Sequence, residues 1–157
     1  MKIQIRRESP GSPAAKGLVK KLDEDLLERY PLQFIHGLRP GDSEDPDLFF
    51  VVAYEGDEAA GWRAQGCGAL RPLEPGVGEI KRMFVLPEHR GKGVARAILS
   101  ALEAQAVKSG YHTVRLETGT KQPEAISLFR SEGYAGILNF GEYADNPMSV
   151  CFEKKLG

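Results

Sequence analysis

Apolar and polar residues alternate along the first part of the chain with two different periods. Residues 2–6 alternate apolar and polar side chains, and residues 48–54 are dense in β-branched and aromatic side chains, so both predict strands. Between them, apolar side chains recur every four positions, which predicts a helix that begins after Ser12 and ends before Pro31. The apolar positions of this helix are Leu18, Leu22, Leu26 and Tyr30. A turn and a returning arm over residues 60–73 then predict a hairpin.

The second part of the chain continues the same alternation of strands and helices. Strands are predicted over residues 78–86 and 112–118, and a helix from about Gly93 to Ser109 lies between them. Its apolar stripe consists of Val94, Ile98, Leu102 and Ala106. A short helix follows, with Pro123 in its first turn and Gly133 just past its end, and then two strands, around Leu138–Phe140 and Ser149–Lys155. The order β-α-β-β-β-α-β-α-β-β predicts a mixed sheet with helices on its faces, of α/β or α+β class.

Composition narrows the class of protein. With 157 residues, 41% of them hydrophobic, the chain predicts one folded domain over residues 1–157. The net charge of −1 gives no field that would attract nucleic acid. The first residues lack the apolar segment of a signal peptide, and no apolar run approaches the ~20 residues that span a bilayer, so we expect a cytoplasmic protein without a membrane partner. Cys67 and Cys151 lack metal-binding spacing, and we expect no metal site.

The stretch between the predicted strand 78–86 and the following helix carries the clearest chemical signal. Gly91 and Gly93 flank Lys92, and Arg90 precedes them, at the point where a helix begins. Unpaired backbone N–H groups at a helix N-terminus bind phosphate oxygens, and glycines let a ligand approach the backbone. A solvated glycine-rich connection is the simplest alternative. A Walker loop does not fit. A dinucleotide fingerprint matches two glycines, with Glu117 as the ribose-binding acid, but its third glycine is absent.

A third pattern fits this turn better. The stretch "RGKGVA" at residues 90–95 matches [Q/R]xxGx[G/A], and the surrounding "EIKRMFVLPEHRGKGVARAIL" and "AISLFRSEGY" are similar to the same family. The chain resembles small bacterial members of the GNAT superfamily of acyl-CoA-dependent N-acetyltransferases over most of residues 48–134. This resemblance implies the GNAT fold, with a mixed central sheet of six to seven strands, about four flanking helices and splayed central strands. It also implies acetyl-CoA as co-substrate.

The resemblance assigns residues to the cofactor site. The backbone of Met83, Phe84 and Val85 would pair with pantetheine, and an N–H near Val85 would stabilise the oxyanion. The pyrophosphate would lie on the turn formed by Arg90, Gly91, Lys92, Gly93, Val94 and Ala95. Gln122 and Phe129, on the short helix, complete the predicted cofactor site.

Direct attack of an amine on a thioester needs a base, because an alkylamine is protonated at neutral pH. Glu79, on the central strand, is the first candidate, and Glu117, on the next strand, is the second. The family's usual acid is a tyrosine where this chain has Phe129, which cannot donate a proton. Tyr134 is therefore the third catalytic candidate, with Tyr143 or a water molecule as further substitutes.

The acceptor site is predicted from segments after the first helix and near the C-terminus. Phe34, His36, Tyr143 and Asn146 are its candidate residues. The sequence thus predicts an acetyltransferase that moves an acetyl group from acetyl-CoA to a primary amine of a small molecule or peptide in a ternary complex. A homodimer is plausible. The alternatives are a non-catalytic acyl-CoA-binding protein of the same fold and a dinucleotide-binding oxidoreductase.

Overall fold

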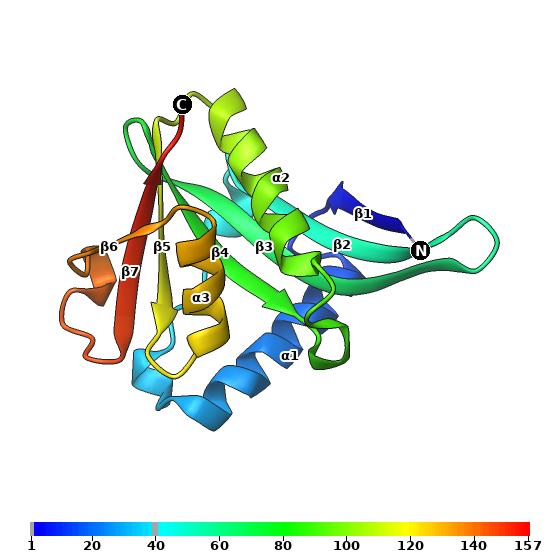
Figure 1. Ribbon diagram of the computed structural model, residues 1–157, viewed down its shortest axis with the longest axis horizontal. Coiled ribbons are helices and arrows are strands. Elements are labelled where there is room, and N and C mark those ends of the chain that lie inside the picture. The colour runs from blue at the N-terminus through cyan, green and yellow to red at the C-terminus, as the bar shows by residue number, and fades with distance from the viewer. Residues whose placement is uncertain (1, 39–40) are drawn as a thin grey trace.

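The computed structural model describes residues 2–38 and 41–157, which form a seven-stranded sheet in the order β1-β2-β3-β4-β5-β7-β6 (Figure 1). The strands are β1 (Lys2–Arg7), β2 (Phe49–Asp57), β3 (Gly61–Glu74), β4 (Val77–Val85), β5 (Thr113–Gly119), β6 (Ala135–Ile137) and β7 (Ser149–Lys155). The α-helices are α1 (Pro13–Arg29), α2 (Val94–Lys108) and α3 (Pro123–Ser131). Short 3₁₀ turns are η1 (Leu32–Phe34), η2 (Asp42–Glu44), η3 (Pro87–His89) and η4 (Gly141–Tyr143). The element order predicted from the sequence is confirmed.

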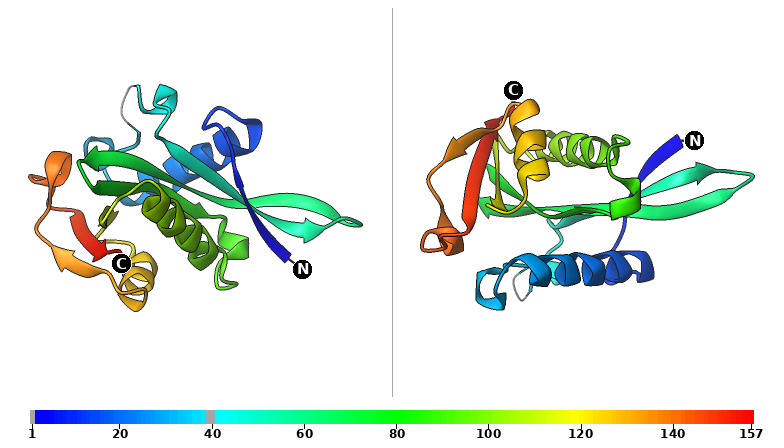
Figure 2. Two further views of the ribbon diagram at one scale, coloured as in Figure 1. Left: turned by 90° about the horizontal axis from the view of Figure 1, so that it is seen from above. Right: turned by 60° about the horizontal axis from the view of Figure 1, so that its bottom comes forward.

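The helices lie on both faces of the sheet, so the molecule has three layers. Helix α1 covers one face, and α2 and α3 cover the other (Figure 2). The predicted apolar stripe of α2 is buried, and Ile98 and Leu102 are fully inside the larger core cluster. Leu18 and Leu22 of α1 belong to a second cluster on the opposite face. These two cores hold the sheet rigid between the helices.

The central strands splay, as the family resemblance implied. Strands β4 and β5 run parallel, and their pairing extends only from Val77 opposite Thr113 to Ile80 opposite Leu116. Strand β4 continues to Val85 and β5 to Gly119, so both strands have further residues beyond the last pair. All other neighbouring strands are antiparallel, which differs from the parallel sheet of a dinucleotide-binding fold. The alternative of a dinucleotide-binding oxidoreductase is therefore not supported.

Strand β4 contains a bulge close to this divergence. Cys67 pairs with Phe84 and Ala69 with Lys81, so a single β3 residue faces two β4 residues. Arg82 lies in this bulge with a φ of 58°, a conformation that is uncommon for a residue with a side chain. The bulge turns Arg82 toward α1, where its guanidinium pairs with Asp23 at 2.5 Å.

Two details of the sequence prediction are corrected. The described residues form three α-helices, and the remaining helical segments are 3₁₀ turns, so the expectation of about four flanking helices is too high. The strand predicted around Leu138–Phe140 is wrong by three residues, because β6 spans Ala135–Ile137 and pairs there with β7. The Leu138 side chain is 92% exposed, so its hydrophobicity does not reflect a place in the sheet.

Candidate active site

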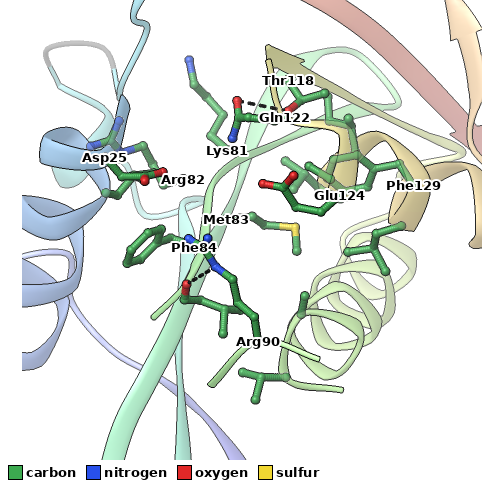
Figure 3. Close-up of a pocket in the computed structure, with 18 of the residues that line it drawn as sticks. Asp25, Lys81, Arg82, Met83, Phe84, Arg90, Thr118, Gln122, Glu124 and Phe129 are labelled. Atoms are coloured by element: carbon green, nitrogen blue, oxygen red, sulfur yellow. Dashed lines mark hydrogen bonds between the residues drawn. The ribbon is translucent and has the colours of Figure 1, made fainter. Parts of the chain in front are cut away.

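A cleft of about 550 Å³ opens where β4 and β5 diverge and reaches the N-terminus of α2 (Figure 3). Ten of the eleven residues predicted for the cofactor site line this cleft, and Lys92 does not. The ten are Met83, Phe84, Val85, Arg90, Gly91, Gly93, Val94, Ala95, Gln122 and Phe129. Side chains of α1 and of the segment after it close the other end.

The turn before α2 presents bare backbone to the cleft. Gly91 and Gly93 have φ values of 78° and 86°, which are favoured only for glycine, and a Cβ at either position would meet open space. No side chain caps α2, whose N-cap residue is Gly93. The first N–H groups of a helix have no partner within the helix, so they are available to an anion at the positive end of its dipole.

The Arg90 side chain links this turn to the end of β4 by a hydrogen bond. Its Nε donates to the backbone oxygen of Val85 at 3.0 Å, and its guanidinium lies 5.7 Å from the centre of the Phe84 ring. The side chain therefore holds the turn and the strand together at the mouth of the cleft.

Gln122 and Phe129 shape the opposite wall. The side-chain oxygen of Gln122 accepts the Gly119 N–H at 3.1 Å, which fixes the connection between β5 and α3. The ring of Phe129 is buried and packs against Tyr134 and Phe152. At this position the side chain supplies apolar surface and no proton.

Glu117 lies on β5 and lines the cleft beside the point of divergence. Its carboxylate accepts the Ser149 hydroxyl at 2.5 Å. Burial raises the pKa of Glu117 above its usual value, while the Ser149 hydrogen bond and the charge of Lys81 oppose this rise. A carboxylate with a raised pKa is a stronger base than an ordinary glutamate, which suits it to accept a proton.

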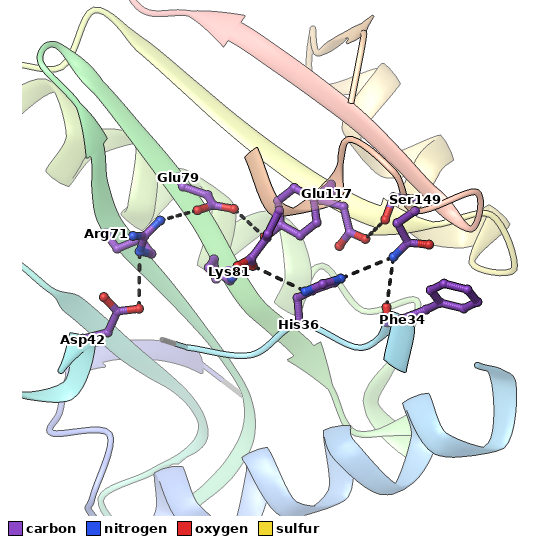
Figure 4. Close-up of polar contacts among 11 residues, drawn as sticks. Phe34, His36, Asp42, Arg71, Glu79, Lys81, Glu117 and Ser149 are labelled. Carbon is purple, nitrogen blue, oxygen red and sulfur yellow. Dashed lines mark hydrogen bonds and ion pairs between the residues drawn. The ribbon is translucent and has the colours of Figure 1, made fainter. Parts of the chain in front are cut away.

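Glu79 is placed differently, because it is buried away from the cleft. Only 1% of it is exposed, one oxygen accepts from Arg71 at 2.6 Å, and the other accepts the Tyr143 hydroxyl at 2.7 Å. Arg71 also pairs with Asp42 at 3.4 Å, so a buried chain of polar groups crosses from η2 to η4 (Figure 4). Both carboxylate oxygens of Glu79 are therefore occupied by structural contacts.

The predicted acceptor residues meet in one cluster, of which His36 lines the cleft. The Tyr143 ring packs edge-on against the His36 ring at 5.2 Å. The Asn146 amide lies 3.4 Å from His36 Nε2 and donates to the backbone oxygen of Phe34 at 3.2 Å. Phe34, Tyr143 and Asn146 are not among the lining residues, so they act from behind His36. Burial, together with the charge of Glu79, raises the pKa of Tyr143 and keeps its hydroxyl protonated.

Tyr134 does not reach the cleft. Its hydroxyl donates to Glu103 of α2 at 2.8 Å, and its ring packs against Phe129 at 5.8 Å. Burial raises the pKa of Tyr134. The residue anchors the end of α3 to α2 and is not among the residues that line the cleft.

Three residues at the site were not predicted from the sequence, namely Lys81, Arg82 and Ser149. Lys81 and Arg82 line the cleft, and Ser149 binds Glu117. A strand alternates its side chains between two faces, so Lys81 could have been placed on the face of Glu79, two residues before it. The bulge at Arg82 leaves no comparable pattern in the sequence.

Within residues 2–38 and 41–157 there is no group of three or more histidine, cysteine or acidic side chains that could hold a metal ion. No described helix is both long and apolar enough to cross a membrane.

Comparison with known proteins gives the same family from sequence and from structure. The Acetyltransferase (GNAT) family profile matches residues 15–134. An "IAA acetyltransferase" of Azospirillum brasilense is 37% identical over 155 residues, covering 98% of each chain. A Klebsiella pneumoniae protein described as an acyl-CoA N-acyltransferase has a TM-score of 0.80 and 32% identity over 99% of this chain and 98% of its own.

A GNAT acetyltransferase of Elizabethkingia anophelis, solved with acetyl-CoA bound, shares the fold at a TM-score of 0.67 and 17% identity over 98% of each chain. The splayed strands, the glycine turn and these likenesses agree: the chain belongs to the GNAT family, and it is an acyltransferase.

Proposed function

We propose that the enzyme transfers an acetyl group from acetyl-CoA to the primary amine of a small molecule or peptide, by direct attack in a ternary complex. One observation carries this proposal. A single cleft extends from the uncapped N-terminus of α2 to the partly buried carboxyl of Glu117. It therefore joins a place for a diphosphate to a group that can accept a proton.

The residues present fit acetyl-CoA. The turn before α2 offers backbone donors and open space for phosphate oxygens. Beyond Ile80, β4 no longer pairs with β5, so Met83 and Val85 lie where the backbone can pair with the amides of pantetheine. The acetyl-CoA bound by the relative of the same fold supports this assignment. When bound, acetyl-CoA supplies an activated acetyl thioester.

Glu117 is the base that we propose, in preference to Glu79. It lines the cleft and has a raised pKa, whereas both oxygens of Glu79 accept hydrogen bonds from buried groups. Glu117 takes the proton that the amine loses as its nitrogen forms the amide bond and the carbon–sulfur bond breaks. Neither Tyr134 nor Tyr143 lines the cleft, so water protonates the leaving thiolate. Because a thiol has a pKa of about 8.5, the thiolate can leave unprotonated at neutral pH with a small free-energy cost.

The test measures thiol release from acetyl-CoA over a panel of amines, amino acids and peptides. With an active acceptor and with kcat/KM expressed per concentration of unprotonated amine, Glu117→Gln should lower kcat/KM by about 10² to 10⁴ and abolish the acidic limb of the pH–rate profile. In the wild type that limb lies above the usual glutamate pKa, because burial raises the pKa of Glu117. Glu79→Gln is the matched control and keeps the limb. An unchanged limb in Glu117→Gln would remove this residue from the mechanism, and an absence of thiol release with every acceptor would overturn the proposed function.

A further inference from the structure

Lys81 is a buried cation in the wall of the cleft. Only 4% of its side chain is exposed, and its Nζ donates to Glu142 at 3.2 Å and lies 5.5 Å from the centre of the Tyr143 ring. An ammonium group has three N–H donors, and among residues 2–38 and 41–157 the structure gives Lys81 one side-chain acceptor, Glu142, which leaves donors for a further group. A buried cation with unused donors favours an anionic ligand that enters the same cleft.

The position of Lys81 relative to Glu117 restricts what that ligand can be. The last residue pair between β4 and β5 is Ile80 opposite Leu116, so Lys81 and Glu117 are the first residues of the two strands beyond the paired part. Both line the cleft, and the charge of Lys81 acts on the carboxyl of Glu117. A cation therefore adjoins the proposed base.

The remaining surroundings of Lys81 also favour a small zwitterionic ligand. Its acidic partner Glu142 is 27% exposed and also lies 3.7 Å from His36 Nδ1, so Glu142 stands at the edge of the cluster. Leu22 and Leu26 of α1 line the same cleft and supply apolar surface. The acceptor end thus combines a base, a buried cation and an apolar wall.

We propose that the acceptor is a free α-amino acid whose carboxylate binds Lys81 while its amine faces Glu117. The inference rests on the proposed function and narrows its acceptor class. In an α-amino acid the amine and the carboxylate are attached to one carbon, so both groups reach two adjacent side chains at once. A peptide N-terminus lacks a carboxylate at this distance. The leucine side chains of α1 favour apolar amino acids.

The experiment compares acceptors that differ only in the carboxylate. Leucine is compared with isopentylamine and leucinamide, and phenylalanine with phenethylamine, as pH-independent kcat/KM values. Wild-type enzyme should favour each amino acid by about ten- to a hundredfold, the usual value of a charge-assisted hydrogen bond. Lys81→Met should remove this preference. Because any effect of Lys81 on the pKa of Glu117 acts on all acceptors alike, the ratio isolates binding of the carboxylate.

Lys154→Met is the matched control. Lys154 also pairs with one carboxylate, Glu103 at 3.0 Å, and lies 5.6 Å from a tyrosine ring, but it is not among the cleft-lining residues. This variant should keep the preference for amino acids. Equal use of leucine, leucinamide and isopentylamine by the wild type would overturn the inference even if Lys81→Met does not fold.

Calorimetric titration of leucine in the presence of CoA separates the inference from the proposed function. Leucine binding that Lys81→Met weakens, without acetyl transfer to any acceptor, would uphold the carboxylate site and overturn the transferase proposal. Acetyl transfer to amines, with no preference for a carboxylate and no leucine binding, would support the proposed function and overturn the carboxylate site at Lys81.

Discussion

At the scale of the residue, Glu79 and Glu117 show why the candidate site was only partly predictable. The sequence places both on neighbouring strands and led us to rank Glu79 first, although nothing in its local pattern distinguishes a base from a structural acid. The difference lies in partners distant along the chain, because Tyr143 is 64 residues from Glu79 and Ser149 is 32 residues from Glu117. Such contacts leave no local pattern. The glycine turn was predictable because its chemistry resides in the local backbone.

Tyr143 should be structural, and removing its hydroxyl tests this. Tyr143→Phe keeps the ring that packs on His36 but deprives the buried Glu79 carboxylate of a donor, which should lower the free energy of unfolding by about 1–3 kcal/mol. The acidic limb of the pH–rate profile should stay in place. Urea unfolding and measurements of the rate as a function of pH check both expectations.

Tyr134→Phe is the matched control, because it removes a hydroxyl that also donates to a carboxylate, that of Glu103. Its stability should fall by a similar amount, and kcat should remain within about twofold, since a structural hydroxyl outside the cleft takes no part in proton transfer. A large loss of kcat in Tyr134→Phe would restore this tyrosine as the general acid.

At the scale of the element, the periodic helices were predicted closely and the short strand near the C-terminus was not. Four-residue spacing of large apolar side chains located α2 to within a residue at each end. Strand β6 has only three residues, Ala135–Ile137, none of them buried, so its sequence carries little hydrophobic signal. The strand was predicted too far along the chain because Leu138 is hydrophobic, although its side chain is exposed.

The turn before α2 provides a prediction at this scale. Gly93→Ala places a side chain at a φ of 86°, which should cost about 1–2 kcal/mol of stability. The new methyl group also projects near the backbone donors of the cleft, so KM for acetyl-CoA should rise by about tenfold or more. Gly133→Ala is the control, because Gly133 has a φ of 91° but follows α3 away from the cleft. Its stability should fall similarly with KM unchanged; a parallel rise in KM would show that general destabilisation, and not the turn, was responsible.

At the scale of the whole molecule, the element order followed from the residue pattern, whereas the splay of the sheet followed only from the family resemblance. Hydrophobic periodicity identifies strands and the faces they bury. Periodicity does not show how far two parallel strands remain paired. The residues after Ile80 and Leu116 keep a strand pattern and lie in β4 and β5, although they no longer pair. The cleft forms between the unpaired ends of β4 and β5.

Stability of the whole fold should depend on the site through Glu117. Burial raises its pKa, so between the ordinary and the raised pKa the unfolded chain has released a proton that the native state retains. Stability is therefore lost as pH rises through this interval. Glu117→Gln removes the loss and should raise Tm at pH 7, while at about pH 3, where the carboxyl is largely protonated in both states, the gain should nearly vanish. Thermal melting of both proteins at the two pH values checks the sign; a lower Tm at pH 7 would contradict it.

The short parallel pairing between β4 and β5 also determines how the two walls of the cleft are joined. Strands β1 to β4 are joined by antiparallel pairs, and β5, β7 and β6 form a second antiparallel group. The four residue pairs that join the two groups bridge strands separated by the whole of α2. The two walls of the cleft therefore belong to two separately hydrogen-bonded groups of strands. Their separation is set by this short join and by the helices that pack across it.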